Sequence, residues 1–436
     1  MTKITIIGAG SIVFTKNLIG DILSILELAD STISLMDIDG GRLDIITKLA
    51  KRMVQQTNKK AVIESSTDRK KAIKNSNYVI TTFQIGGLEY YAYDLEIPAK
   101  YGLNQGVGDT LGPGAVFRAM RTIPVILDLC RDMEEVCPDA LLMNYVNPMA
   151  MITWAVNTAS NIKCVGLCHS VQETAKNIAS YIDVPFAELT YNAAGINHMA
   201  WYLELKWKGK NVYPMLFEAM KNPDIYNKDI TKFVIMKMFG YFITESSYHV
   251  SEYMPYFRQS QDMIDKINRM DSWLKQWNGD CFAYVNERQS DFYEKVDRQI
   301  AGLEPVDITR SYEYGPGIIH AIETGVPYKI YGNVMNKGLI ANLLNDCCVE
   351  VPCLVDKCGI TPCYVGKIPP QLAGLNSTNI NVQELAVHAA INGDQDAAIQ
   401  AVLLDPLTAS VVPYQRIKDM VMEMFEVEKN LLPQFK

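Results

Sequence analysis

Three short polar segments between residues 141 and 201 contain side chains of the types that bind metal ions and move protons. The first contains Asn147 and Pro148, the second Cys168 and His169, and the third His198. A cysteine thiolate and a histidine imidazole are common metal ligands, and such a site keeps open positions for substrate oxygens. We therefore expect Cys168 and His198 to bind a metal ion. Asn147 would bind substrate hydroxyls, and His169 would be a separate proton donor.

Each polar segment follows an apolar run that is typical of a β-strand, at 141–143, 163–167 and 190–194. Strands that alternate with helices form a parallel sheet, and ligands bind beyond the carboxyl ends of its strands. The three polar segments are therefore expected to meet at one edge of a sheet.

A glycine turn at the start of the chain has the form of a dinucleotide-binding turn. A strand is expected over 4–7 and a helix over 15–26, and the turn between them contains Gly8, Gly10 and Ser11. The two glycines allow a tight turn and let the backbone approach a pyrophosphate at the N-terminus of the helix.

The next expected strand, 32–36, ends in Asp37. A carboxylate at this position accepts hydrogen bonds from a ribose, which favours NAD over NADP as the cofactor. Asp39 is a second candidate for this contact. Gln84, which follows the next strand but one, would lie at the nicotinamide end of the cofactor.

Two further segments contain residues that could reach the site. The glycine-rich loop 104–114 carries Asp109, a possible substrate-binding residue. The segment 244–253 combines aromatic, hydroxyl and charged residues, including Tyr248 and Tyr253, which is typical of a pocket wall.

The overall pattern predicts an α/β protein with two domains. A doubly wound Rossmann domain, of the kind found in lactate and malate dehydrogenases, is expected at 1–190, where strands and helices alternate. An α+β domain at 191–436 would contribute to the substrate site and to oligomerisation. Its expected elements are a separate antiparallel sheet from 199–207 and 211–214, a helical segment at 227–277 and a mobile polar segment at 278–304.

Composition excludes several other classes of protein. The chain has 436 residues and a net charge of −8, which argues against nucleic acid as a partner and provides no basic patch for a membrane. The ten cysteines have no framework spacing, so we expect free thiols, buried in the case of those at 347–363, and a cytoplasmic location without a signal peptide. Apolar C-terminal helices suggest a homodimer or homotetramer.

The glycine turn at Gly8, the sequence VNP at 146–148, GLCHS at 166–170 and GINHMAW at 195–201 together resemble glycoside hydrolase family 4. The resemblance extends to further motifs and covers nearly the whole chain. Within the family, the pattern is closest to that of the bacterial α-galactosidases, which cleave terminal α-galactosides such as melibiose.

The resemblance implies NAD and a divalent metal, usually manganese, held by Cys168 and His198. It also implies that NAD⁺ oxidises the sugar at C3, that the leaving group is eliminated across C1–C2, and that water then adds, so that NAD is not consumed. His169 would be the general acid. The base at C2 would be Tyr248 or Tyr253, with Glu245 and Glu252 as rivals.

Other interpretations remain open at the level of the sequence. Ligand type alone would favour zinc or iron over manganese, because a thiolate is a soft ligand. The enzyme could be an α-glucosidase or α-galacturonidase of the same family. An NAD-dependent hydroxy-acid dehydrogenase would share the fold and the cofactor but would produce NADH stoichiometrically, and a non-catalytic NAD-binding sensor would leave the metal ligands without a role.

Overall fold

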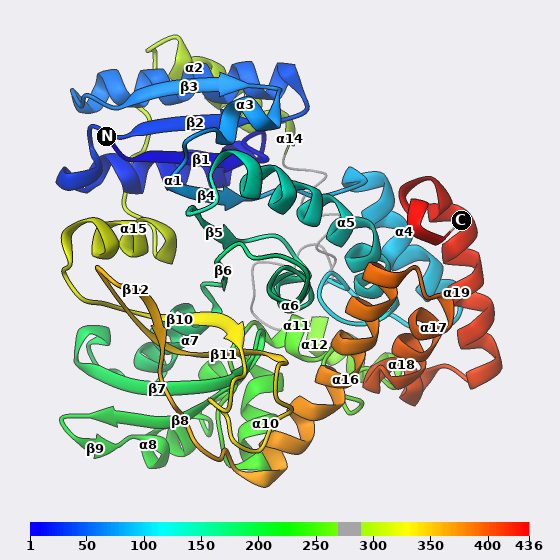
Figure 1. The fold of residues 1–436 in the computed structure, drawn as a ribbon. Helices are drawn as coiled ribbons and strands as arrows, with labels where there is room; N and C mark the ends of the chain where they lie inside the picture. The colour runs from blue at the N-terminus through cyan, green and yellow to red at the C-terminus, as the bar shows by residue number, and fades with distance from the viewer. Residues whose placement is uncertain (269–288, 436) are drawn as a thin grey trace.

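The computed structural model describes residues 1–268 and 289–435, in which a mixed sheet of twelve strands forms the centre of the molecule (Figure 1). The strand order is β3-β2-β1-β4-β5-β6-β10-β11-β7-β8-β9, and β12 pairs with β11. The six strands from β3 to β6 in this order are parallel to one another, and the strands from β10 to β9 pair in antiparallel fashion.

The N-terminal strands have the order 3-2-1-4-5-6 of a doubly wound dinucleotide-binding fold, as expected from the sequence. β4 is buried along its whole length, since helices cover both faces of a parallel sheet. The strands of this half are β1 (Lys3–Ile7), β2 (Thr32–Met36), β3 (Val62–Ser66), β4 (Tyr78–Thr81), β5 (Leu141–Asn144) and β6 (Cys164–Leu167). The helices are α1 (Ile12–Ser24), α2 (Gly40–Thr57), α3 (Arg69–Ile73), α4 (Gly87–Lys100), α5 (Pro113–Val136), α6 (Met149–Ala159) and α7 (Ser170–Tyr181).

The prediction of a separate sheet in the second half is wrong, because the strands of this half extend the first sheet. β10 pairs with β6 in antiparallel register, with Gly332 opposite Leu167, so the sheet continues across both halves of the chain. The expected division at residue 190 stays a prediction. The strands of this half are β7 (Leu189–Ile196), β8 (Met199–Trp207), β9 (Lys210–Asn211), β10 (Tyr328–Met335), β11 (Cys348–Asp356) and β12 (Gly359–Pro362).

Several expected local structures of the second half also differ from those observed. Residues 213 and 214 begin a helix, not a strand, because Pro214 fits the first turn of a helix. The segment 227–277 is not one helix, since Gly240 ends α10 in a left-handed conformation; its residues beyond 268 lie outside the described part. Residues 289–300 of the expected mobile segment form a helix, and 278–288 lie outside the described residues. The helices between β9 and β10 are α8 (Tyr213–Ala219), α9 (Pro223–Tyr226), α10 (Ile230–Phe239), α11 (Ser247–Val250), α12 (Gln261–Asn268), α14 (Gln289–Ile300) and α15 (Tyr314–Thr324).

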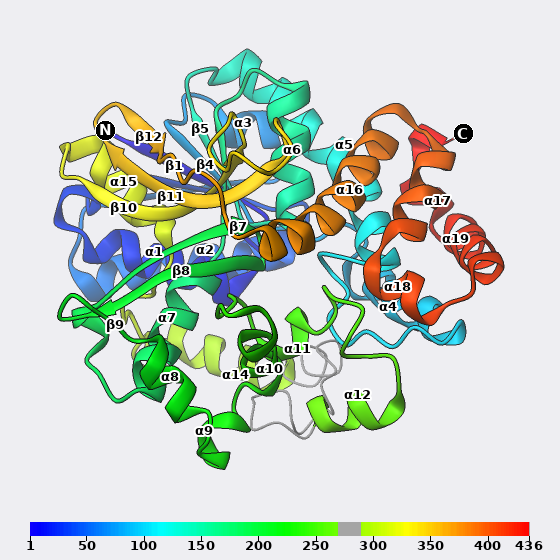
Figure 2. The same ribbon diagram turned by 90° about the horizontal axis from the view of Figure 1, so that it is seen from below.

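The C-terminal helices pack beside the first half of the chain (Figure 2). α16 contacts α5, and α19 contacts α4, so the end of the chain supports helices that follow β4. These elements are α16 (Pro370–Asn392), α17 (Gln395–Leu404), α18 (Pro406–Val411) and α19 (Tyr414–Glu428).

The cysteines of 347–363 are only partly buried. Cys347, Cys348 and Cys353 are buried as expected, but Cys358 and Cys363 are exposed, because they lie at the two ends of the short edge strand β12. None of the helices within the described ranges is both long and apolar enough to cross a membrane.

Candidate active site

The glycine turn lies between β1 and α1 and contacts the end of β2. Gly8 has a φ of +86°, and a Cβ atom there would lie 2.5 Å from the carbonyl oxygen of Thr82, so only glycine fits. The N–H of Gly10 donates to Oδ2 of Asp37 at 2.7 Å. Asp39, the rival of Asp37, is the N-cap of α2 and accepts from the first N–H groups of that helix. Asp37 is therefore the carboxylate that faces the turn.

The N-terminus of α1 suits a phosphate group. Ser11 is exposed at the N-cap position and makes no side-chain capping hydrogen bond, and the first turn of α1 has no acidic residue. Uncapped N–H groups and the positive end of the helix dipole favour a bound anion. The residues present therefore fit the pyrophosphate of a dinucleotide.

Cys168, His198 and Glu245 lie close enough together to share a metal ion. Sγ of Cys168 is 3.4 Å from Nε2 of His198, and Nε2 is 3.4 Å from Oε2 of Glu245. One ligand atom from each residue lies within 4.8 Å of the other two. Cysteine, histidine and glutamate side chains all supply metal ligands, so the donor set fits a divalent cation.

Two of these three residues have strained backbone conformations. His198, between β7 and β8, has a φ of +62°, and Glu245, in the loop after α10, has a φ of +76°. Left-handed backbone at such residues costs about 1–3 kcal/mol and is common at functional sites. The conformation brings both side chains to Cys168, which follows β6 directly.

The protonation of the cluster suits a cation. Burial raises the pKa of the Cys168 thiol to about 12, so the sulfur carries a proton until a metal displaces it. Burial opposes the charge on Glu245, but His198 and His249 outweigh it and hold the pKa of that carboxyl well below its usual range. Glu245 is therefore a carboxylate ready to bind.

His169 lies beside the cluster at the N-terminus of α7, with a side chain that is about half exposed. Its Nδ1 lies 3.3 Å from Oε1 of Glu313, and its Nε2 lies 3.5 Å from Oε2 of Glu173. The contact with Glu313 raises the pKa of His169 to about 10, although burial opposes this rise. The imidazole is therefore protonated at neutral pH, as a general acid requires.

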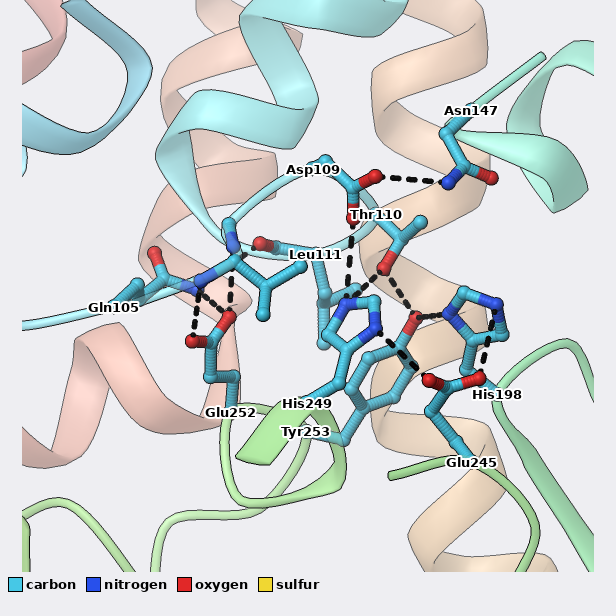
Figure 3. Close-up of polar contacts among 12 residues, drawn as sticks. Gln105, Asp109, Thr110, Leu111, Asn147, His198, Glu245, His249, Glu252 and Tyr253 are labelled. Atoms are coloured by element: carbon cyan, nitrogen blue, oxygen red, sulfur yellow. Dashed lines mark hydrogen bonds and ion pairs between the residues drawn. The ribbon is translucent and has the colours of Figure 1, made fainter. Parts of the chain in front are cut away.

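The two expected tyrosines have different surroundings. The hydroxyl of Tyr253 donates to Oγ1 of Thr110 at 2.7 Å and lies 3.4 Å from Nδ1 of His198 (Figure 3). The hydroxyl of Tyr248 instead donates to the carbonyl of Asn268, and its ring belongs to a small apolar cluster with Ile230. The contacts therefore favour Tyr253 as the tyrosine of the site.

A chain of polar contacts connects Glu245 of this cluster with the loop after β4. Nδ2 of Asn147 donates to Oδ2 of Asp109 at 2.8 Å, and Oδ1 of Asp109 is 3.4 Å from Nε2 of His249, whose Nδ1 lies 3.7 Å from Glu245 (Figure 3). On the other side, Arg118 donates to the carbonyl of Asn147 and to the side chain of Gln84. Asp109 thus contacts Asn147 directly, and Arg118 joins Asn147 to Gln84.

Sequence reasoning missed several members of this arrangement. The sequence pattern puts His249 in a pocket wall without a role, whereas the structure places its Nδ1 3.7 Å from Oε1 of Glu245. Glu245 was considered only as a base. Glu252, also considered as a base, binds backbone amides of the loop 104–114. Glu350 gave no signal because it lies in an apolar run, yet it is completely buried beside Asn333, and burial raises its pKa to about 8.

The chain is similar to known proteins in both sequence and fold. A family model described as "Family 4 glycosyl hydrolase" matches residues 3–184, and the model of the C-terminal domain of the same family matches residues 193–408. A protein of Bacillus subtilis named alpha-galactosidase is 40% identical over 438 residues, which cover 100% of both chains. An alpha-galactosidase of Rhizobium meliloti is 39% identical over 440 residues, which cover 99% of this chain and 89% of the relative.

Solved structures show the same fold. A 6-phospho-alpha-glucosidase from gut microorganisms, crystallised with NAD and Mn²⁺, superposes with a TM-score of 0.84 over 100% of both chains at 20% identity. The chain therefore shares the fold of this enzyme over its whole length.

Proposed function

This chain belongs to family 4 of the glycosyl hydrolases, and from that premise we propose that it is an α-galactosidase that hydrolyses terminal α-galactosides such as melibiose. The observation that carries this proposal is the similarity, over the whole chain, to proteins named alpha-galactosidase. The clustering of Cys168 after β6, His198 after β7 and Glu245 in the loop after α10 supports a metal-dependent reaction.

We propose NAD and a divalent cation, usually manganese in this family, as the bound groups. Gly8, Gly10, Ser11 and Asp37 would hold NAD. Cys168, His198 and Glu245 would hold the cation. When bound, NAD would supply a hydride acceptor for C3 of the sugar, and the cation would supply a Lewis acid for the oxygens beside it.

The chain's own residues then have separate tasks in an elimination across C1 and C2. Tyr253 would take the proton from C2 after its hydroxyl proton has moved to Thr110, whose own hydroxyl proton would move to Nε2 of His249 at 2.7 Å. His169 would give its proton to the departing oxygen at C1. Asn147 and Asp109, which already contact each other, would hold sugar hydroxyls. Addition of water at C1, with return of a proton to C2 and of the hydride to C3, would complete a hydrolysis in which no NAD is consumed.

A screen of nitrophenyl glycosides, with and without NAD⁺ and Mn²⁺ and in the presence of a thiol reductant, tests the proposal. Release of nitrophenol from the α-galactoside should require both NAD⁺ and the metal, and no NADH should accumulate. Faster release from the α-glucoside, the α-galacturonide or a 6-phosphoglycoside would change the proposed substrate but not the proposed mechanism. Release without NAD⁺ would contradict the mechanism, and stoichiometric NADH would indicate a dehydrogenase.

We also propose that the enzyme is cytoplasmic and is a homodimer or homotetramer. A metal-binding thiol needs a reducing compartment, and the nine cysteines of the described ranges are all free. Large apolar side chains are exposed on the C-terminal helices, namely Leu404, Tyr414 and Met422, which is consistent with a contact between subunits. Sedimentation velocity would measure the oligomeric state.

A further inference from the structure

The carboxylate of Glu252 lies in a cradle of backbone N–H groups. Its Oε1 accepts from the N–H groups of Gly106 and Val107 at 2.7 and 3.0 Å, and its Oε2 accepts from that of Gly108 at 2.8 Å. The side-chain amide of Gln105 lies 3.4 Å from Oε2. The side chain of Glu252 is only 2% exposed, so these charge-assisted bonds form out of water, where they are strong.

The loop that Glu252 binds has little structure of its own. Residues 104–112 form no helix or strand, and both Gly108 and Gly112 have positive φ angles. Glycines give such a loop many alternative conformations when nothing holds it. Its beginning is held by Arg258, whose guanidinium donates to the carbonyl and the side chain of Asn104. Its middle is held by Glu252.

The loop carries two residues into the site on the side opposite Glu252 (Figure 3). Asp109 contacts Asn147, and Thr110 accepts from Tyr253 and contacts His249. Glu252 and Tyr253 are consecutive residues, so one short turn both holds the loop and contacts the residue that the loop presents.

From this geometry we infer that Glu252 is a positioning residue for the active site. Its carboxylate holds the loop 104–112 in the conformation that places Asp109 beside Asn147 and Thr110 beside Tyr253. It does not act as a base, because both of its oxygens are already bound to the loop. The expected loss of turnover when Glu252 is replaced rests on the proposed function. The expected change in the conformation of the loop 104–112 does not.

The variant Glu252→Gln tests this inference, because it keeps the size of the side chain but turns an amide group toward a backbone N–H donor. Amide hydrogen exchange in the peptide that contains 104–112 should become at least about tenfold faster, since charge-assisted bonds are lost. The kcat/KM for the α-galactoside should fall by about tenfold to a hundredfold, because displaced groups orient the substrate poorly. Binding of NAD⁺ and of Mn²⁺ should stay within about twofold of the wild type.

Two further variants complete the experiment. Glu323→Gln is the matched control, since Glu323 also accepts two hydrogen bonds, from Thr2 and Tyr78, but lies away from the loop. It should change neither exchange in the loop nor turnover. Glu252→Asp keeps the charge on a shorter side chain. Its amide exchange in 104–112 and its kcat/KM should lie between those of the wild type and of Glu252→Gln. This variant still tests the inference if Glu252→Gln does not fold.

The outcomes separate this inference from the proposed function. Unchanged exchange in 104–112, or faster exchange with unchanged turnover, would overturn it. Loss of Mn²⁺ binding would overturn it too, because it would show that Glu252 acts on the metal centre. If the wild type fails to cleave any α-galactoside with NAD⁺ and Mn²⁺, the proposed function fails, and the exchange measurements still decide whether Glu252 holds the loop.

Discussion

Glu245 would add a hard oxygen donor to the pair of softer ligands that we propose, Cys168 and His198. Cys168 and His198 alone would favour zinc or iron, whereas carboxylate oxygens favour manganese and other hard cations. The position of Glu245, with an oxygen 3.4 Å from Nε2 of His198, therefore makes the proposed manganese more consistent with the site.

The variant Glu245→Gln tests this role. It should weaken Mn²⁺ binding by at least about tenfold, since a metal site loses that much even when a residue that supports its ligands is removed. Isothermal titration calorimetry of the wild type and the variant measures the difference. Glu204→Gln, at an exposed position of β8, is the control and should bind Mn²⁺ like the wild type. Equal affinities for all three proteins would remove Glu245 from the metal site.

Tyr253 and Tyr248 form a matched pair for testing the base at C2. Tyr253→Phe should lower kcat by about a hundredfold or more, because general-base catalysis contributes about 10²–10⁴-fold. It should also slow the incorporation of solvent deuterium at C2 of the sugar, which mass spectrometry detects. Tyr248→Phe removes the hydrogen bond to the carbonyl of Asn268 and should leave deuterium incorporation unchanged. The reverse result would make Tyr248 the base.

The role of His169 can be tested through the leaving group. His169→Asn should reduce kcat/KM for melibiose by about 10²–10⁴-fold, because the departing sugar alkoxide needs a proton. A dinitrophenyl galactoside, whose leaving group needs no proton, should lose far less. Glu173→Gln removes an exposed neighbour of His169 and should affect both substrates little. Equal losses for both substrates in His169→Asn would mean that the imidazole does not donate the proton.

At this scale, the sequence predicted residues whose local context is informative and missed those placed by distant contacts. Gly8, Gly10 and Cys168 follow strands that are recognisable from nearby residues. The place of Glu252 depends on a loop more than 140 residues earlier in the chain. No local pattern encodes such a pairing. From the sequence, the carboxylate of Glu252 could therefore be a catalytic base or a group that holds the loop 104–112.

The two C-terminal helices α17 and α18 begin with aspartates that differ in burial. Asp394, the N-cap of α17, is partly exposed, and a backbone hydrogen bond from Ala397 lowers its pKa. Asp405, the N-cap of α18, is only 1% exposed, and burial raises its pKa to about 6, although bonds from Thr408 oppose this rise. The two helices should therefore respond differently to pH.

The variant Asp405→Asn should become more stable relative to the wild type as the pH rises from 5 to 7.5. The folded pKa of Asp405 lies above its unfolded value of 3.8, so the folded state holds a proton that the unfolded state has lost. Ionisation in this window therefore destabilises the wild type, by an amount on the order of 1 kcal/mol, and cannot occur in the variant. Chemical denaturation at several pH values measures the difference.

Asp394→Asn is the control for this prediction. The lowered pKa of Asp394 stabilises the folded state above the unfolded pKa of 3.8, and this stability is lost only as the pH falls through the folded pKa. In a His388→Gln background, which removes the imidazole whose Nε2 lies 3.2 Å from Oδ2 of Asp394, the effect of Asp394→Asn should thus be constant between pH 5 and 7.5. A constant difference for Asp405→Asn as well would show that Asp405 ionises normally.

At the scale of elements, the alternating first half was readily predicted and the second half was not. Strands β1 to β6 are followed by helices at short distances along the chain, so their order follows from general rules of α/β proteins. The pairing of β10 with β6 joins segments more than 160 residues apart. An alternating apolar pattern indicates a strand but not its partner, and this is why a separate sheet was expected.

The whole molecule places its proposed metal ligands on both halves of the chain. Cys168 follows a strand of the first half, whereas His198 and Glu245 belong to the second half, and one sheet runs through both. Binding of a cation should therefore stabilise the two halves together, because the folded state has the complete ligand set and the unfolded state does not.

The wild type should unfold in a single thermal transition that Mn²⁺ moves to higher temperature. At a hundred times its dissociation constant, a ligand stabilises the folded state by about 2.7 kcal/mol. A chain of 436 residues has an unfolding entropy of about 0.9 kcal/mol/K, so the midpoint should rise by about 3 °C. Differential scanning calorimetry measures this shift, which should be absent in Cys168→Ser. A second transition that Mn²⁺ leaves in place would show that one half unfolds independently of the metal site.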